Sequence, residues 1–168
     1  MPAPVAEIRR ATPADAGGIA AVLAVVTAER IHSAIDRAWT ADEQRRYLES
    51  LSPREAIHVA VDAGHGIVGL QVVDRWSAGL TSMSHVGQVG TFLLPEWRHR
   101  GVGHRLWSAT IAFAREAGYR KLIIQVRGSN AAAQAFYQRL GFQPCGRLSR
   151  QVVIDGIDDD EVLMEHFL

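Results

Sequence analysis

The chain has 168 residues, the length of one domain that can hold a hydrophobic core without disulfides or a structural metal. Hydrophobic residues make up 48% and charged residues 21% of the sequence, a composition that excludes intrinsic disorder. Lys plus Arg (18) equals Asp plus Glu (18), and this zero net charge argues against nucleic acid or an anionic membrane as the main partner.

Cysteine usage and hydropathy indicate the compartment. The single cysteine, Cys145, allows no internal disulfide and no cysteine zinc site. Residues 1–10 lack the apolar core of a secretory signal, and the longest apolar stretch, residues 19–26, is far shorter than the ~20 residues that span a bilayer. We therefore expect a cytoplasmic protein. The seven histidines form no motif such as H-E-x-x-H, so no bound metal is expected.

The first half of the chain alternates between strand and helix signals. Residues 5–10 predict a short strand, and residues 13–29 a helix with an apolar stripe. Thr40 and Glu43 form a capping box that begins a second helix. Three strands are then predicted in succession, over residues 57–62, 67–76 and 84–94.

The second half continues the alternation. The remaining predicted elements are, in chain order, a helix over residues 101–117, a buried strand over 121–126, a helix ending at Leu140, and two closing strands over 151–154 and 161–168. Asp155-Gly156 between the closing strands favours a hairpin turn. The order predicts one α/β (α+β) domain over residues 1–168, and the three consecutive strands exclude a doubly wound sheet.

The chemistry is concentrated where a strand leads through a basic loop into a helix, over residues 89–106. A helix start carries unpaired N–H groups and a partial positive charge, and Gly101 and Gly103 allow a ligand to approach the backbone closely. Positive side chains gather at the same place: Arg98, His99, Arg100, His104 and Arg105. The segment therefore predicts a pyrophosphate site.

Two nucleotide-binding motifs fit this segment poorly. The P-loop string G-x-x-x-x-G-K-S/T is absent from the sequence. In the dinucleotide fingerprint G-x-G-x-x-G, Leu106 would occupy the position of the third glycine, and Gly101 lies too far beyond the strand.

Two motifs instead resemble those of the GNAT N-acetyltransferase superfamily. Arg98-His99-Arg100-Gly101-Val102-Gly103 fits its acyl-CoA-binding pattern, Q/R-x-x-G-x-G/A. Residues 130–142 resemble its signature N-x-x-A-x-x-F/Y-Y-x-x-x-G-F. With the element order, the resemblance covers nearly the whole chain. It implies a mixed, mostly antiparallel central sheet of about six to seven strands flanked by about four helices.

The resemblance also implies acetyl-CoA as co-substrate and a set of residues that hold it. The backbone from Arg98 to His104 would hold the pyrophosphate, through Arg98, His99, Arg100, Gly101, Val102, Gly103 and His104. The main chain of Phe92 and Leu93 would pair with the pantetheine arm in a gap that a strand bulge opens. A main-chain N–H near Leu93 would face the thioester oxygen.

The helix motif implies two further roles. Asn130 would contact the pantetheine arm, and the Tyr137 hydroxyl would protonate the departing thiolate. The two positions are seven residues apart, two helical turns, so they share a face of the helix. In the alternative interpretation, Tyr137 packs in the core and Asn130 only caps the helix.

The general base is not identified by the sequence. Many relatives carry Glu where this chain has Gln88, which cannot take a proton at neutral pH. His85, Glu29 and Asp36 are candidates, as are a water chain and an acceptor amine of low pKa. The acidic run of Asp155, Asp158, Asp159, Asp160 and Glu161 could attract a cationic acceptor or form a solvated hairpin.

The sequence therefore predicts an acetyl-CoA-dependent N-acetyltransferase that acts by direct attack of a primary amine on the thioester. The amine would belong to a small molecule, such as an amino acid or amino-acid-like antibiotic, or to a protein. The alternatives are a CoA-sensing or partner-binding module without turnover, and a nucleotide-binding protein. Because relatives often pair and the net charge is zero, a homodimer is expected.

Overall fold

The computed structural model describes residues 6–168, so Val5, where the first strand was expected to begin, lies outside the described residues. The strands are β1 (Glu7–Arg10), β2 (Ala56–Asp62), β3 (Gly66–Arg75), β4 (Val86–Leu93), β5 (Lys121–Arg127), β6 (Gln143–Ile154) and β7 (Ile157–Phe167). The helices are α1 (Ala16–Ala28), α2 (Ala41–Ser50), α3 (Val102–Glu116) and α4 (Ala131–Arg139). Short 3-10 turns precede α1, β4 and α3.

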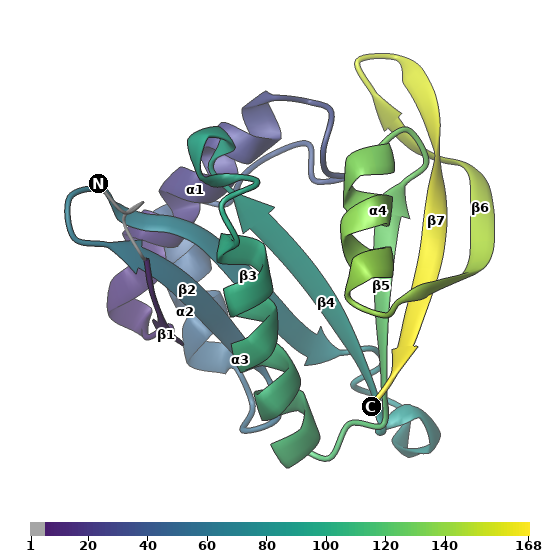
Figure 1. Ribbon diagram of the computed structural model, residues 1–168, viewed down its shortest axis with the longest axis horizontal. Helices are drawn as coiled ribbons and strands as arrows, with labels where there is room; N and C mark the ends of the chain where they lie inside the picture. Colours follow the sequence, from purple (N-terminus) through teal and green to yellow (C-terminus); the bar gives the residue numbers. More distant parts are fainter. Residues whose placement is uncertain (1–5) are drawn as a thin grey trace.

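The strands form one sheet in the order β1-β2-β3-β4-β5-β7-β6 (Figure 1). Neighbouring strands are antiparallel except β4 and β5, which are parallel. Four helices cover this seven-stranded sheet, which confirms the expected fold class. No helix within residues 6–168 has the length and apolar character needed to cross a membrane.

The helices lie on both faces of the sheet. Figure 1 shows α3 in front of β2–β4 and α4 in front of β5, with α1 and α2 behind. The core on the α3 and α4 side includes Trp107, Ile124 and Phe142, all buried. The core on the other face joins Ile19 of α1 to Ile57 of β2. Each helix therefore buries its apolar stripe against the sheet.

Local signals set several element boundaries as expected. Thr40 Oγ1 accepts from the Glu43 N–H at 3.2 Å, and the Glu43 carboxylate accepts from the Thr40 N–H at 2.8 Å, so the capping box is formed. Asp155 and Gly156 have φ of 52° and 76° and make the tight turn between β6 and β7. Positive φ at both central residues matches the right-handed twist of the hairpin strands.

One strand is longer than the sequence indicates. β6 spans Gln143–Ile154, although only residues 151–154 were predicted as strand. The first nine residues of β6, an edge strand of the sheet, are all exposed, so neither of its faces is covered over this stretch. Without a buried face, these residues show no alternation of apolar and polar side chains, which is the signal that identifies strands.

The sheet opens between its two parallel strands. β4 and β5 pair from Val86 opposite Lys121 to Gln88 opposite Ile123, and beyond these residues they spread apart (Figure 1). The expected bulge is not the cause, since β4 pairs with β3 without a register shift from Gly87 to Leu93. The gap arises instead because the parallel pairing ends early, and Tyr137 of α4 packs beside it.

Candidate active site

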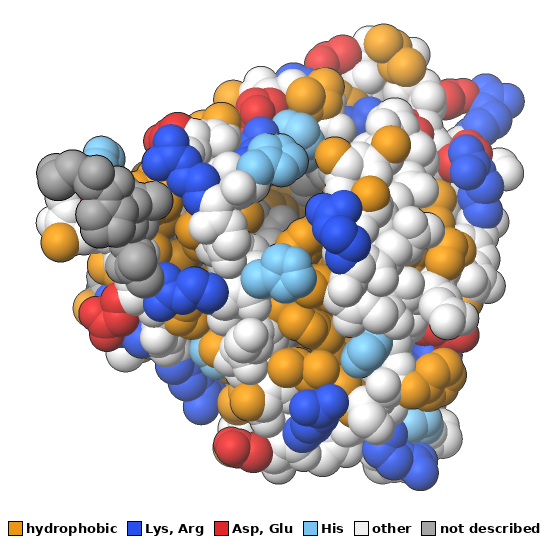
Figure 2. All heavy atoms as spheres, viewed as in Figure 1, with side chains coloured by type: hydrophobic (Ala, Val, Ile, Leu, Met, Phe, Trp, Pro, Cys, Tyr) orange, Lys and Arg blue, Asp and Glu red, His pale blue; other side chains and the backbone are white. Residues whose placement is uncertain are grey.

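A cavity of about 600 Å³ occupies the gap between β4 and β5. Figure 2 shows the surface hollowed at its centre, with basic side chains and histidines around the rim. The lining comes from β4, β5, the loop before α3 and the first turn of that helix, α4 along its length, Glu161 of β7, the end of α1 and the segment between α1 and α2. Both faces of the sheet therefore contribute to one cavity.

The main chain of β4 directs toward this cavity groups that neither β3 nor β5 pairs. The Leu94 N–H donates to the Val68 carbonyl of β3, and the Val86 carbonyl accepts from Trp76. Because main-chain groups alternate sides along an antiparallel strand, the even-numbered residues from Val86 to Leu94 face β3. The N–H and carbonyl of Thr91 and of Leu93 therefore point toward the gap.

This alternation separates the two strand residues singled out from the sequence. Phe92 lies opposite Leu70, and its main chain faces β3. The Leu93 main chain faces the gap, where its carbonyl accepts from Arg98 Nε at 3.2 Å. The Leu93 N–H remains directed at the cavity. Thr91, which the sequence did not single out, shares this orientation.

The start of α3 offers three further backbone donors. Gly101 caps the helix with φ 78°, a left-handed conformation that glycine adopts without strain. The first bond of the helix joins the Arg105 N–H to the Gly101 carbonyl at 3.1 Å. The N–H groups of Val102, Gly103 and His104 precede this bond and have no acceptor within the helix.

Gly103 keeps the cavity open at this point. A Cβ here would lie 3.0 Å from Cζ of Phe136 and 3.6 Å from Cδ1 of Leu93. Phe136 belongs to α4 and Leu93 to β4, so the bare backbone of Gly103 lies where α3, α4 and β4 meet. A side chain at this position would displace an aromatic ring of the cavity wall.

Some side chains of the basic loop line the cavity, and others lie elsewhere. Those of Arg98, His99 and His104 line the cavity, with His104 also packed edge-on against Phe136. Arg100 is outside the lining and lies over the Trp97 ring, 5.8 Å from its centroid. Val102 is buried in a core cluster with Trp97 and Leu106, so only its backbone can reach a ligand.

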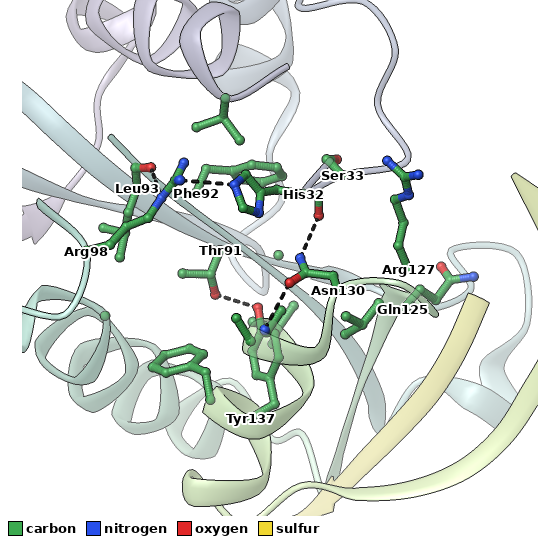
Figure 3. A pocket seen from close by; sticks show the side chains of 18 of the residues that line it. His32, Ser33, Thr91, Phe92, Leu93, Arg98, Gln125, Arg127, Asn130 and Tyr137 are labelled. Carbon is green, nitrogen blue, oxygen red and sulfur yellow. Dashed lines mark hydrogen bonds between the residues drawn. The ribbon is translucent and has the colours of Figure 1, made fainter. Parts of the chain in front are cut away.

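Arg98 is held by the end of α1. Its guanidinium pairs with the Glu29 carboxylate through both nitrogens, one bond being 2.9 Å from Nη1 to Oε1. His32 Nε2 lies 3.0 Å from Arg98 Nη1 and 3.3 Å from Glu29 Oε1 (Figure 3). The Arg98 guanidinium lowers the pKa of Glu29, against the opposing effect of burial. Glu29 is therefore a poor candidate for the base.

The segment between α1 and α2 lies over the open end of the gap. Arg127 Nη1 donates to the Arg30 carbonyl at 2.7 Å, and Asn130 Nδ2 donates to the His32 carbonyl at 3.1 Å. The Asn130 Oδ1 accepts from the Ala133 N–H at 3.1 Å and caps α4. Asn130 thus caps its helix and also joins the α1–α2 segment to the cavity wall (Figure 3).

Tyr137 is buried with its hydroxyl directed at β4. The hydroxyl donates to Thr91 Oγ1 at 2.7 Å, and Gln71 Nε2 donates to the same oxygen at 2.8 Å (Figure 3). Burial raises the pKa of Tyr137 to about 12. The phenol therefore keeps its proton at neutral pH while its ring lines the cavity.

Of the other residues considered in connection with the general base, some line the cavity and some do not. Gln88 lines the cavity, as expected from its place on β4. His85 and Asp36 are not part of the cavity lining among the described residues. Glu161 is the one carboxylate among residues 6–168 that lines it.

Several lining residues were missed by the sequence analysis because no local pattern marks them. Thr91 looks like any polar strand residue, and its role depends on contacts with residues 20 and 46 positions away. His32 and Ser33 lie in an irregular segment without periodicity. Glu161 was noted only as part of an acidic run. Within residues 6–168, no group of three potential metal ligands occurs.

Comparisons with known proteins agree with this architecture. The sequence profile of the acetyltransferase (GNAT) family matches residues 26–142. A Bacillus subtilis protein, provisionally named a ribosomal protein bS18-alanine N-acetyltransferase, is 30% identical over 111 residues. That match spans 64% of this chain and 66% of the relative, just under two thirds of its length.

Two solved structures illustrate the similarity of fold. The ribosomal-protein-alanine N-acetyltransferase from Brucella melitensis has a TM-score of 0.88 at 23% identity, over 96% of this chain and 98% of its own. The phosphinothricin acetyltransferase from Sinorhizobium meliloti, in complex with AcCoA, has a TM-score of 0.89 at 20% identity, over 98% and 89%. Because the family profile covers more than half of the chain, this protein belongs to the GNAT acetyltransferase family.

Proposed function

We propose that this protein is an N-acetyltransferase that transfers an acetyl group from acetyl-CoA directly to a primary amine. The observation that supports the proposal most strongly is the open gap between β4 and β5. It combines main-chain groups of Thr91 and Leu93 that no strand pairs, the helix start at Gly101, and a protonated phenol at Tyr137. A thioester ligand needs these three features in one place.

Different residues around the gap would bind different parts of acetyl-CoA. The N–H groups of Val102, Gly103 and His104 would bind the pyrophosphate, and the side chains of His99 and His104 line the cavity beside them. Thr91 and Leu93, rather than Phe92, would pair with the pantetheine arm, because their main chain faces the gap. We assign Arg98 mainly to positioning, since Glu29 already neutralises its charge.

The same geometry supports a role for Leu93 and then for Tyr137 in the reaction. The Leu93 N–H would stabilise the negative charge that develops on the thioester oxygen when the amine attacks. Tyr137 would then give its proton to the departing thiolate, with Thr91 holding the hydroxyl in place. The proton that the nitrogen loses as the amide forms would pass through water and restore the phenol. A phenol whose pKa is raised to about 12 remains protonated over the working range.

The acceptor is proposed to be a small primary amine. The cavity of about 600 Å³ must take both the thioester end of the co-substrate and the amine. The α1–α2 segment covers its open end through bonds from Arg127 and Asn130. A protein amine, as the names of the Bacillus and Brucella relatives suggest for those proteins, is the second candidate.

An acceptor screen with acetyl-CoA tests the proposal by measuring free thiol. The panel should contain phosphinothricin, free amino acids, polyamines, aminoglycosides and a peptide that begins with alanine. Release of thiol with a small amine would support the proposal, and release with the peptide alone would favour the protein acceptor. Binding of acetyl-CoA with no turnover across the panel would favour the non-catalytic CoA-sensing module.

We further propose a cytoplasmic homodimer. Zero net charge gives little self-repulsion, and the edge strand β6 carries exposed apolar side chains at Leu148 and Val153. Sedimentation equilibrium at micromolar concentration should then give twice the chain mass of 18.4 kDa. A mass of one chain would refute the dimer.

A further inference from the structure

The acidic hairpin at the end of the chain contains one carboxylate that differs from its neighbours. The aspartates of the run are each paired with an arginine: Asp155 with Arg30, Asp158 with Arg150, Asp159 with Arg127, and Asp160 with Arg147. Glu161 has no cation within salt-bridge range among residues 6–168. Its contact is a hydrogen bond from Gln125 Nε2 to Oε2 at 3.1 Å.

Glu161 is also buried, with 9% of its surface exposed, and its side chain lines the cavity. Burying a carboxylate without a cation is unfavourable, and burial accordingly raises the pKa of Glu161. The nearest arginine across the strand pair, Arg127, is engaged with Asp159 at 2.8 Å. The fold therefore keeps a carboxylate in the cavity with its charge uncompensated.

The position of Glu161 relative to the gap is set by the strand registers. Gln88 stands opposite Ile123 in the parallel pair, so it shares a sheet face with Gln125, two residues further along β5. Gln125 in turn bonds to Glu161. The alternate residues of β5 pack with Tyr137 on the opposite face. Glu161 and Tyr137 thus enter the cavity from opposite sides of the sheet.

We infer that Glu161 binds the ammonium group of the acceptor amine. This inference rests on the proposed function and narrows its substrate class to small amines that arrive as cations. All other charged residues that line the cavity are basic or histidine: Arg98, Arg127, Arg139, His32, His99 and His104. Glu161 is therefore the one carboxylate of the described cavity lining with which a cation on the Gln88 side can form an ion pair.

The amine and the thiol would then occupy separate sides of the gap. Glu161 places the acceptor on the face of Gln88 and Gln125, and Tyr137 holds the departing sulfur on the face of α4. An ammonium bound at Glu161 would give up one proton to water before the free amine attacks the thioester, because Gln88 on β4 cannot accept that proton. Glu29 cannot take over that task, because Arg98 holds both of its oxygens.

Titration calorimetry on the CoA-loaded protein tests the inference directly. The probes are agmatine, putrescine, phosphinothricin and L-alanine amide, each of which carries an ammonium group at neutral pH. We expect Glu161→Gln to weaken binding of the amines that bind the wild type by about tenfold or more. CoA affinity should stay unchanged, because no CoA contact is assigned to Glu161.

Glu165→Gln is the matched control. Glu165 lies on the same strand and face, four residues away, but pairs with Lys121 and is not part of the cavity lining. Its substitution should leave amine affinity as in the wild type. Glu161→Asp, which keeps the charge on a shorter side chain, should retain part of the amine affinity that Glu161→Gln loses.

Steady-state kinetics with the best acceptor of the screen gives a second measurement. Glu161→Gln should raise KM for the amine and leave KM for acetyl-CoA unchanged. The inference is overturned if no probe binds the CoA-loaded wild type, if Glu161→Gln binds the amines as tightly, or if only kcat falls. The proposed function fails separately, when the wild type does not bind acetyl-CoA or releases no thiol with any acceptor.

Discussion

Tyr137 illustrates how one buried side chain obtains its orientation from another element. Its hydroxyl bonds to Thr91 on β4, and Thr91 is held in turn by the amide of Gln71 on β3. Gln71 is fully buried, so its amide direction is fixed by this contact. A hydroxyl can both donate and accept, and Thr91 can therefore donate to the Tyr137 oxygen when the phenol gives up its proton.

Tyr137→Phe removes this hydroxyl and keeps the ring. We expect kcat to fall by ~100-fold, the usual effect of removing a general acid, with little change in acetyl-CoA affinity. Stability should change by no more than about 1–2 kcal/mol, since one hydrogen bond is lost. Steady-state kinetics and thermal unfolding measure the two effects.

Tyr119→Phe is the control for that substitution. Tyr119 is also buried, and its hydroxyl donates to the Arg54 carbonyl at 2.8 Å, away from the cavity. Its loss should lower stability by a similar amount without affecting kcat. Full kcat in Tyr137→Phe would show that Tyr137 only packs in the core and that the thiolate leaves unaided.

Gly103→Val tests the proposed pyrophosphate site at the start of α3. The new side chain would meet the Phe136 ring, because a Cβ alone already lies 3.0 Å from it. We expect acetyl-CoA affinity to fall tenfold or more, which corresponds to about 1.4 kcal/mol. Gly17→Val is the control, since a Cβ there has no neighbour within 4 Å. Unchanged affinity in a folded Gly103→Val protein would mean that the pyrophosphate binds elsewhere.

At the scale of elements, the segment between α1 and α2 is held at three points. Glu29 pairs with Arg98 before α3, the Arg30 carbonyl accepts from Arg127 of β5, and the His32 carbonyl accepts from Asn130, the N-cap of α4. The three partners come from both sides of the gap. The segment therefore connects the two halves of the sheet over the cavity.

Glu29→Gln should weaken this connection in a pH-dependent way. The pKa of Glu29 is lowered in the folded protein, chiefly by Arg98. Its contribution to stability is therefore present above the ordinary glutamate pKa of about 4.3 and is lost as pH falls through the folded value. We expect a loss of about 1 kcal/mol at pH 7 for this partly buried pair.

Chemical denaturation of both proteins between pH 7 and about pH 3 measures this difference, because the folded pKa of Glu29 lies below the ordinary value of about 4.3. The difference in free energy of unfolding between wild type and Glu29→Gln should become smaller as the pH is lowered. Asp158→Asn serves as control, because the Arg150–Asp158 pair is exposed and should contribute little at any pH. A difference that stays constant with pH would contradict the assigned role of the Glu29 charge.

The elements were predictable to the extent that their residues carry a local signal. Thr40 caps α2 through Glu43, and Asp155-Gly156 makes its turn, because these interactions span only a few residues. Gly101 could be placed at a helix start for the same reason. The direction of the Leu93 N–H depends on pairing with β3, and the bonds that hold Arg98 depend on α1. Neither relation can be derived from neighbouring residues.

At the scale of the whole molecule, the sheet consists of two halves that meet over a short parallel pairing. One cluster of buried side chains crosses this junction, from Val73 of β3 through Tyr137 of α4 to Met164 of β7. We propose that this shared cluster makes residues 6–168 unfold as one unit.

Thermal unfolding with and without acetyl-CoA tests this. We expect a single transition, and a free energy of unfolding that rises by about 2.7 kcal/mol when acetyl-CoA is present at about 100 times its Kd. The Tm should rise by roughly 5–10 °C for a chain of this size. ATP at the same concentration should give no shift. Two transitions would indicate that the halves unfold separately, and an equal shift with ATP would favour a nucleotide-binding protein.

The unpaired edge of β4 also bears on the behaviour of the protein before any ligand arrives. A strand with free N–H and carbonyl groups is a template on which strands of other molecules can assemble into aggregates. Here that edge lies inside the hollow between β4 and β5, under the α1–α2 segment. A narrow, flexible chain such as pantetheine can enter, but a strand that belongs to a folded sheet is too wide. The strand edge of β4 can thus stay open to hydrogen bonding by a ligand without becoming a site of self-association.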